Sequence, residues 1–164
     1  MIEAVVTPDG RFVFGREIFR CAIGAAGIRP HKVEGDHATP AGLLPLRRVL
    51  YRADRVKLPK AAVLREPIAS DDGWCDDGYS PLYNTQIRLP ADVRHEALWR
   101  DDGLYDVLGV LGWNDAPVQR ERGSAIFLHI ARPDFAPTEG CIALPLPTLL
   151  HVLAEGLTAI RVVA

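Results

Sequence analysis

The chain has 164 residues, of which 48% are hydrophobic, and this size and composition fit one domain with one core over residues 1–164. Its formal net charge of −2 provides no positive field for nucleic acid, so no nucleic-acid partner is expected. The 14 glycines and 13 prolines are spread along the chain, which favours many short strands with tight turns over a linker or a low-complexity segment.

The N-terminal residues and the cysteines narrow the class of protein further. The first ten residues lack the basic, apolar and small-residue pattern of a signal peptide, and no apolar run is long enough to span a membrane. Cys21, Cys75 and Cys141 are an odd number without C-x-x-C pairing, so neither a disulfide framework nor a zinc site is expected. At least one thiol therefore stays free, and no cofactor is indicated.

The first third of the chain predicts β structure. Ile2–Thr7 and Arg11–Phe14 are rich in β-favouring residues on either side of a P-D-G turn, which predicts a hairpin. Glu17–Ile23 predicts a third strand. A loop rich in glycine and proline follows, after which Leu43–Tyr51 predicts another strand.

Three residues of that loop, His31, Asp36 and His37, are of types that bind metals. Such residues on one turn-rich loop more often face solvent, so we expect no metal site here.

The segment Trp74–Asn84 combines aromatic, amide and carboxylate side chains on a turn-rich loop, a composition typical of the lining of a cleft. Tyr83 and Asn84 are the first candidates for substrate contact. Cys75 is expected to pack rather than to act as a second nucleophile, because no histidine lies close to it in the sequence.

The second half of the chain predicts two helices among further strands. Ala91–Arg100 predicts a helix because its apolar residues recur at helical spacing, and Leu104–Trp113 predicts a strand that pairs with Ser124–Ala131. Pro145–Glu155 predicts the second helix, and Thr158–Val163 predicts the closing strand. Many strands and two short helices indicate a mostly β fold, a β-sandwich whose ends or one face the helices cover.

The stretch Ser124–Leu144 carries the candidate chemistry. Ser124–Leu128 is short, apolar and aromatic, which predicts a buried strand that ends at His129. Prolines exclude a helix from the following loop, where Gly140 allows unusual backbone angles. The amides of Gly140 and Cys141 are thereby expected to point at one spot, which outlines an oxyanion hole.

His129 and Cys141 are twelve residues apart, a distance that allows a strand, a loop and a reversal to bring the two side chains together. An imidazole beside a thiol can take its proton and make it a nucleophile. The alternative is structural, with Cys141 as a small core residue and His129 as a histidine at a strand end. The spacing alone leaves both interpretations open.

This stretch resembles the catalytic signature of the L,D-transpeptidases, the cysteine enzymes of peptidoglycan cross-linking. Their pattern is a strand-end H-G, then a loop that closes on S/T-x-G-C, a branched residue, Arg, and Met or Leu; here H-I, T-E-G-C and I-A-L stand at those places. Three positions depart from it, since Ile130 replaces the glycine, Ala143 the arginine, and Glu139 a histidine before G-C. The matching residues are His129, Thr138, Gly140, Cys141 and Leu144.

The resemblance implies an L,D-transpeptidase-type β-sandwich that uses no cofactor and transfers acyl groups between peptidoglycan stem peptides through a thioester on the cysteine. The cysteine, the histidine and Gly140 would form the catalytic set. The G-D-H-A-T-P-A-G and W-C-D-D-G-Y-S-P-L-Y-N segments resemble family segments on the substrate side. Thr138 and Glu139 are further candidates for substrate contact, and Arg132 is the candidate to supply the charge of the missing arginine.

Two alternatives stay open. The same cysteine could serve a hydrolase, an L,D-carboxypeptidase or amidase, or the site could belong to a non-catalytic module that binds cell-wall peptides. Glu139 is the feature that distinguishes an enzyme from a binding module. A carboxylate beside a thiol raises the pKa of the thiol, unless the carboxylate instead orients and charges His129. The resemblance implies a periplasmic or cell-envelope location, whereas the lack of a signal peptide keeps a cytoplasmic one as the alternative. The sequence does not indicate the oligomeric state.

Overall fold

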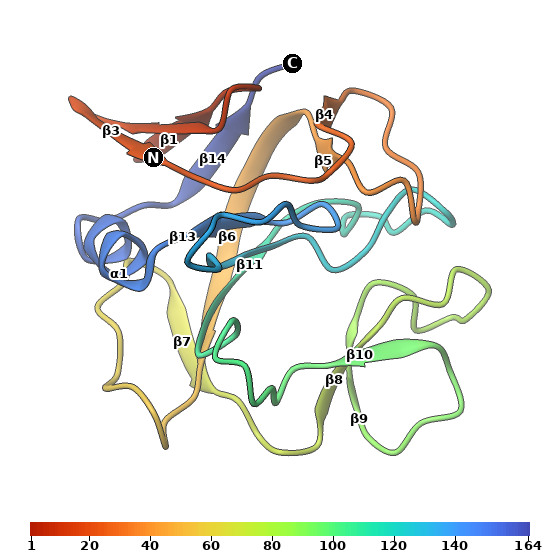
Figure 1. Ribbon diagram of the computed structural model, residues 1–164. Helices are drawn as coiled ribbons and strands as arrows, with labels where there is room; N and C mark the ends of the chain where they lie inside the picture. Colours follow the sequence, from red (N-terminus) through yellow and green to blue (C-terminus); the bar gives the residue numbers. More distant parts are fainter.

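One long strand, β6, runs through the middle of the molecule and joins its parts (Figure 1). The computed structural model describes residues 1–164. The elements in chain order are β1 (Glu3–Val6), β2 (Arg11–Phe14), β3 (Glu17–Arg20), β4 (Ile28–Arg29), β5 (Thr39–Pro40), β6 (Gly42–Tyr51), β7 (Leu64–Pro67), β8 (Asp72–Cys75), β9 (Gln86–Arg88), β10 (His95–Ala97), β11 (Val107–Leu111), β12 (Phe127–Ile130), β13 (Ile142–Leu144), α1 (Leu146–Ala154) and β14 (Ala159–Val162).

The pairing of β6 changes along its length. Its first residues pair with β14, and its later residues pair with β11 on one side and with β7 on the other. The resulting nine-stranded sheet has the order β13-β12-β11-β6-β14-β1-β2-β3, with β7 attached to β6. A three-stranded sheet, β10-β8-β9, lies at the opposite end of the molecule from the β1-β2-β3 part (Figure 1).

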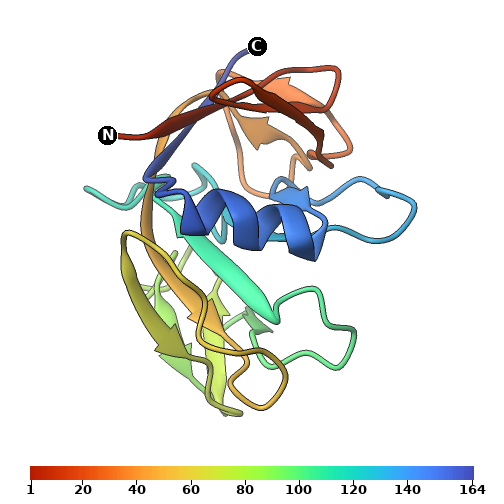
Figure 2. The same ribbon diagram turned by 90° about the vertical axis from the view of Figure 1, so that its left-hand side faces the viewer.

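The main core lies between the large sheet and α1, which crosses in front of the strands in Figure 2. It contains 20 buried hydrophobic residues, to which α1 contributes Leu149, Val152 and Leu153. Burying side chains of this size stabilises the fold by roughly 1.5 to 3 kcal/mol each. The helix begins after Pro145 and has nine residues, and no helix of the structure is long and apolar enough to cross a membrane.

A second, smaller core joins the three-stranded sheet to the large one. It contains nine buried residues, among them Trp74, Tyr105, Phe127 and Cys141. The rings of Trp74 and Tyr105 both meet Phe127 edge to face, with centroids 5.1 and 5.8 Å apart. Phe127 opens β12, so this core fixes the start of the strand that carries His129.

Most of the predicted strands are confirmed, and the mostly β fold with them. The N-terminal hairpin, β6, the antiparallel pair β11 and β12, and β14 all form where their patterns indicated. The helix predicted over Pro145–Glu155 is confirmed as α1.

The helix predicted over Ala91–Arg100 is wrong. His95, Glu96 and Ala97 form strand β10, which pairs with β8, and the Leu98 amide donates to the Asp72 carbonyl at 3.0 Å. Leu98 is fully buried in the second core. Strand pairing and this burial outweigh a weak local helical periodicity, so the domain has one helix rather than two.

Candidate active site

The two strands that carry the candidate catalytic residues lie side by side. β12 and β13 pair in parallel, with Leu128 opposite Ile142 and His129 opposite Ala143. Side chains two residues apart on a strand share a face, so Cys141, which precedes β13, lies on the same face as Ala143 and hence as His129. Because the strands are parallel, residues 131–141 form a crossover connection instead of the expected reversal.

The segment before β12 is irregular and differs from the predicted strand Ser124–Leu128. Ala125 has a φ of 53°, and its amide donates to the Asn84 side chain at 3.1 Å. The strand therefore starts at Phe127. This irregular segment places the Ala125 carbonyl against the cysteine, where it accepts a hydrogen bond from the Cys141 thiol at 3.3 Å.

The end of the crossover loop is held from two directions. The Thr138 hydroxyl donates to the Cys141 carbonyl at 2.6 Å and accepts from the Gly140 amide at 3.1 Å. The segment after β3 holds both the loop and β13, because the Thr138 amide donates to the Ile23 carbonyl at 2.9 Å and Ala22 and Ala143 exchange two backbone hydrogen bonds of 2.9 Å. Gly140 has a φ of 136°, and a Cβ there would lie 2.8 Å from the Ala38 carbonyl oxygen, so the tight approach requires glycine.

The Cys141 thiol is nearly enclosed, with 9% of the residue exposed. Besides donating to Ala125, its sulfur lies 3.4 Å from the Phe127 amide, which donates to it. Burial raises the pKa of the thiol to about 12, and the carboxylates of Glu96 and Glu139 add to this rise. The cysteine is therefore a neutral thiol at physiological pH.

His129 is held as a neutral imidazole. Its Nδ1 lies 2.9 Å from the Ile130 carbonyl oxygen, which only accepts, so Nδ1 carries the proton and Nε2 is left as an acceptor. Burial lowers the pKa of His129 to about 4. The Tyr105 ring packs edge-on against the imidazole at 5.4 Å. The histidine is thus a base rather than an imidazolium partner for a thiolate.

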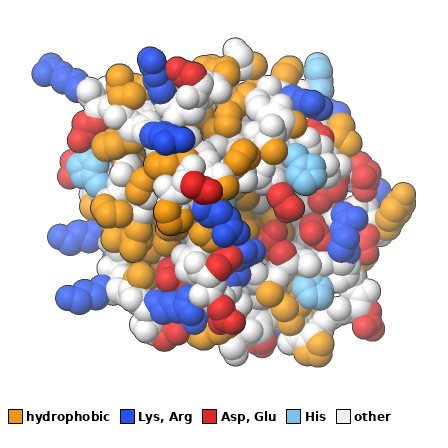
Figure 3. All heavy atoms as spheres, in the orientation of Figure 1, with side chains coloured by type: hydrophobic (Ala, Val, Ile, Leu, Met, Phe, Trp, Pro, Cys, Tyr) orange, Lys and Arg blue, Asp and Glu red, His pale blue; other side chains and the backbone are white.

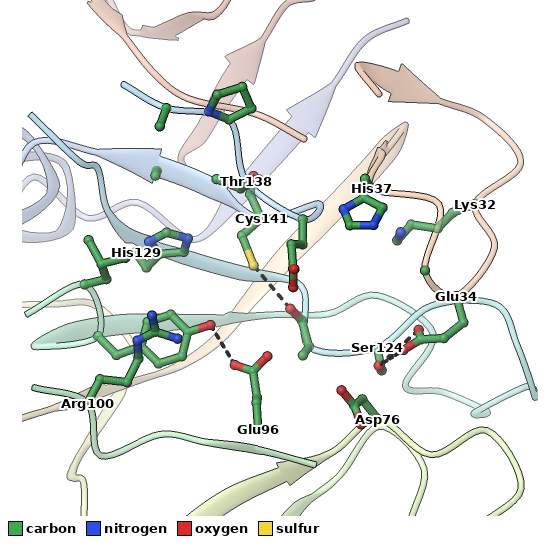
Figure 4. Close-up of a pocket in the computed structure, with 18 of the residues that line it drawn as sticks. Lys32, Glu34, His37, Asp76, Glu96, Arg100, Ser124, His129, Thr138 and Cys141 are labelled. Carbon is green, nitrogen blue, oxygen red and sulfur yellow. Dashed lines mark hydrogen bonds between the residues drawn. The ribbon is translucent and has the colours of Figure 1, made fainter. Parts of the chain in front are cut away.

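Both residues open into a pocket of about 650 Å³ (Figure 4). Five carboxylates line it, from Glu34, Asp76, Glu96, Glu121 and Glu139. Acidic side chains also gather on the right-hand half of the face seen in Figure 3.

The four basic side chains of the lining are mostly paired. Lys32 bonds Asp36 at 2.6 Å, Arg94 bonds Asp76 at 3.1 Å, and Arg100 bonds Asp102, whereas Arg132 has its nearest carboxylate, also Asp102, 4.0 Å away. The open space is therefore acidic, with Arg132 as the least engaged cation.

A family model of the L,D-transpeptidase catalytic domain matches residues 4–160, nearly the whole chain. The chain belongs to this family. No curated protein matches it. The mostly β architecture, with one helix, agrees with membership of the L,D-transpeptidase catalytic-domain family.

Most of the candidate site residues from the sequence meet at the pocket. Cys141, His129, Thr138, Glu139 and Arg132 all line it. Gly140 lies behind the cysteine, with its amide directed at the Thr138 hydroxyl. Glu139 is exposed and makes no hydrogen bond to His129, so it does not orient the imidazole.

Tyr83 and Asn84 do not line the pocket. The structure places them behind its wall, where the Asn84 side chain accepts from Trp74 and Ala125 and donates to the carbonyls of Trp113 and Asn114. The Tyr83 hydroxyl donates to Glu34 at 2.9 Å and accepts from the Gly123 amide at 3.1 Å. Both residues hold the irregular segment that faces Cys141.

Three polar residues of the site, Glu34, Glu96 and Lys32, were not among the candidates identified from the sequence. Glu34 accepts from the Ser124 hydroxyl, and Glu96 accepts from the Tyr105 hydroxyl at 2.6 Å. Because residues 91–100 were predicted as a helix, Glu96 was not recognised as a site residue. A predicted strand over residues 95–97 would have placed the Glu96 side chain on the opposite face from those of His95 and Ala97. No local signal marks Lys32, which becomes 96% buried only through the folding of its loop.

The loop considered for metal binding is built differently. Asp36 accepts from Lys32 and from the amides of Val33 and Ala38, which occupies its carboxylate. His37 lines the pocket, and no group of His, Cys, Asp and Glu side chains in the structure has an arrangement that could hold a metal ion.

Proposed function

We propose that this chain is a cysteine acyltransferase that forms a thioester with one peptidoglycan stem peptide and passes the acyl group to an amine of a second. The observation that carries the proposal is a buried thiol, Cys141, on the same face as a neutral His129 whose Nε2 is free, at the wall of a pocket. Membership of the L,D-transpeptidase family supports the class of substrate.

In the first half-reaction the Nε2 of His129 takes the proton of the Cys141 thiol as the sulfur attacks. The attacked carbonyl is the one that precedes the terminal D-alanine of a donor tetrapeptide. A C–S bond forms, the C–N bond to D-alanine breaks, and the histidine returns its proton to the leaving nitrogen. A neutral thiol and a neutral base suit this concerted transfer better than a resting ion pair.

The tetrahedral oxyanion needs donors close to the sulfur. The Cys141 amide makes no hydrogen bond within the chain and is the donor that we propose. The Gly140 amide is already engaged by the Thr138 hydroxyl, so it contributes only if that 3.1 Å hydrogen bond is exchanged for one to substrate.

Intact-mass spectrometry tests the proposal directly. With a tetrapeptide donor, the parent protein should gain the mass of the donor minus D-alanine, and peptide mapping should place the adduct on Cys141. Cys141→Ala should gain nothing, whereas Cys75→Ser, which changes a thiol outside the pocket, should behave as the parent. A carbapenem offers a second probe, because a thiolate can open its strained ring to give a stable adduct.

The two alternatives are outcomes of the same experiment. If the parent gains no mass from either probe, the non-catalytic binding module is the better interpretation. If the adduct forms but is released only to water when an amine acceptor is present, the protein is a hydrolase. The proposed substrate also assigns the activity to the cell envelope, which fractionation followed by immunodetection would test.

A further inference from the structure

Glu96 is a partly buried acid in the pocket that the steps above do not use. It is the middle residue of β10 and pairs with Trp74 of β8, which directs its side chain toward the pocket below Cys141 (Figure 4). Its Oε1 accepts from the Tyr105 hydroxyl at 2.6 Å. Its Oε2 makes no hydrogen bond within the chain, so one carboxyl oxygen is free to meet a molecule in the pocket.

The surroundings of Glu96 place its ionisation near neutrality. Burial raises the pKa of Glu96 to about 7, while the hydrogen bond from Tyr105 and the charge of Arg100 lower it in part. The negative charges of Asp76 and Glu139 raise the pKa of Glu96 further. The charge of Glu96 in turn raises the pKa of the Cys141 thiol. Such a group can both give and receive a proton under physiological conditions.

The proposed reaction moves one more proton in each half than the thiol and His129 carry between them. An amide nitrogen that leaves as an ammonium ion gains two protons, of which the thiol supplies one through the histidine. In the second half-reaction an incoming ammonium ion loses two protons when it becomes an amide nitrogen, and only one of them returns to the sulfur. One further proton is therefore needed in the first half and released in the second.

We propose that Glu96 is this second acid–base residue, giving one proton to the leaving amine and taking one from the ammonium group of the acceptor. This inference rests on the proposed acyl transfer. The proton balance closes over one turnover, since Glu96 is a carboxylic acid before the first step, a carboxylate in the acyl-enzyme and a carboxylic acid again after transfer. As a carboxylate in an acidic pocket, it also attracts the ammonium group that it will deprotonate.

The test separates steps that need the extra proton from steps that do not. An activated ester donor, whose leaving group departs without protonation, should acylate Glu96→Gln at the rate of the parent. Acylation by the tetrapeptide should fall roughly 100-fold, the usual size of a general-acid contribution. Transfer to an alkylammonium acceptor should fall similarly, whereas transfer to hydroxylamine, which is mostly unprotonated at neutral pH, should change little.

Two further variants make the result specific. Asp92→Asn removes an exposed carboxylate that precedes β10 but does not line the pocket, and it should leave all four rates within about twofold of the parent. Tyr105→Phe keeps the Glu96 carboxyl but removes a hydrogen bond that lowers its pKa, so the ionisation near pH 7 in the rate profile should move upward. Since this variant retains Glu96, it tests the inference even if Glu96→Gln folds poorly.

Two results would overturn the role of Glu96 alone. One is an equal loss of acylation rate in Glu96→Gln with the activated ester and with the tetrapeptide. The other is a pH–rate profile of Tyr105→Phe that is the same as that of the parent. A parent protein that forms no acyl-enzyme with either donor would overturn the acyl transfer and this inference together.

Discussion

Cys141 lies diagonally across from His129, two residues back from Ala143, which is the direct partner of the histidine in the parallel pair of strands. The thiol donates to the Ala125 carbonyl at 3.3 Å instead of to the imidazole. In the resting site the proton is thus held on sulfur and directed at a backbone carbonyl, so the thiol must turn away from Ala125 before His129 can take its proton.

The reactivity of Cys141 toward alkylating agents should reveal this neutral resting state. Because burial raises the pKa of the thiol to about 12, the rate of alkylation by iodoacetamide should be slow at pH 7 and should rise continuously up to pH 10. Mass spectrometry after timed quenching measures the rate, with Cys141→Ala as the blank. A flat, fast rate between pH 5 and 8 would instead indicate a thiolate–imidazolium pair.

The dependence of stability on pH should show two opposed contributions. The folded-state pKa of His129 is lowered to about 4, so the unfolded chain binds more protons and stability is lost as the pH falls from 6.5 to 4. The pKa of Glu96 is raised to about 7, so the folded chain binds more protons and stability is gained as the pH falls from 7 to 4.5. Each effect is about 3 kcal/mol, and together they should nearly cancel.

Single variants would separate the two effects. His129→Gln should become more stable on acidification from pH 7 to 4.5, and Glu96→Gln should become less stable, as measured by urea unfolding at each pH. The parent should change least of the three. The same pH dependence in all three proteins would contradict the assigned protonation states.

Gly140→Ala tests the close approach of the crossover loop to Ala38. The new Cβ would lie 2.8 Å from the Ala38 carbonyl oxygen, so the loop must shift and acylation should fall by at least about tenfold. Gly15→Ala is the matched control, because Gly15 also has a positive φ, 61°, but no atom lies within 4 Å of the added carbon. It should cost about 1 kcal/mol of folding free energy and leave acylation intact. Equal effects of the two substitutions would mean that backbone strain alone matters.

Arg132 is expected to supply the positive charge that Ala143 lacks. Its side chain lines the pocket, is 52% exposed and has its nearest carboxylate 4.0 Å away. A charge-assisted hydrogen bond to a substrate carboxylate contributes about 1.5 kcal/mol at such a site, so Arg132→Ala should lose roughly tenfold in kcat/KM on stem peptides with a free carboxylate. Amidated peptides should be unaffected, and equal kinetics of both proteins on both peptides would remove Arg132 from the site.

The sequence was informative where the signals are local. The P-D-G hairpin, the strand β6 and the T-E-G-C loop each carry their signal within about ten neighbouring residues, and the structure contains all three. Glu96 could not be found in this way, because β10 exists only through its pairing with β8. Asn84 shows the same limit, since its hydrogen bonds reach Trp113 and Ala125, which lie 29 and 41 residues away.

The contact between Ala22 and Ala143 also affects when the folded site around Cys141 can form during synthesis of the chain. The cysteine loop is held by residues from the first 25 positions, through Ala22 and through the Ala25 amide, which donates to the Thr138 carbonyl at 2.9 Å. β1 in turn pairs with β14 in the last few residues of the domain. Contacts that join distant parts of a chain form slowly. On the ribosome, therefore, the thiol site should be among the last parts to assemble, and a partly made chain should carry no reactive centre.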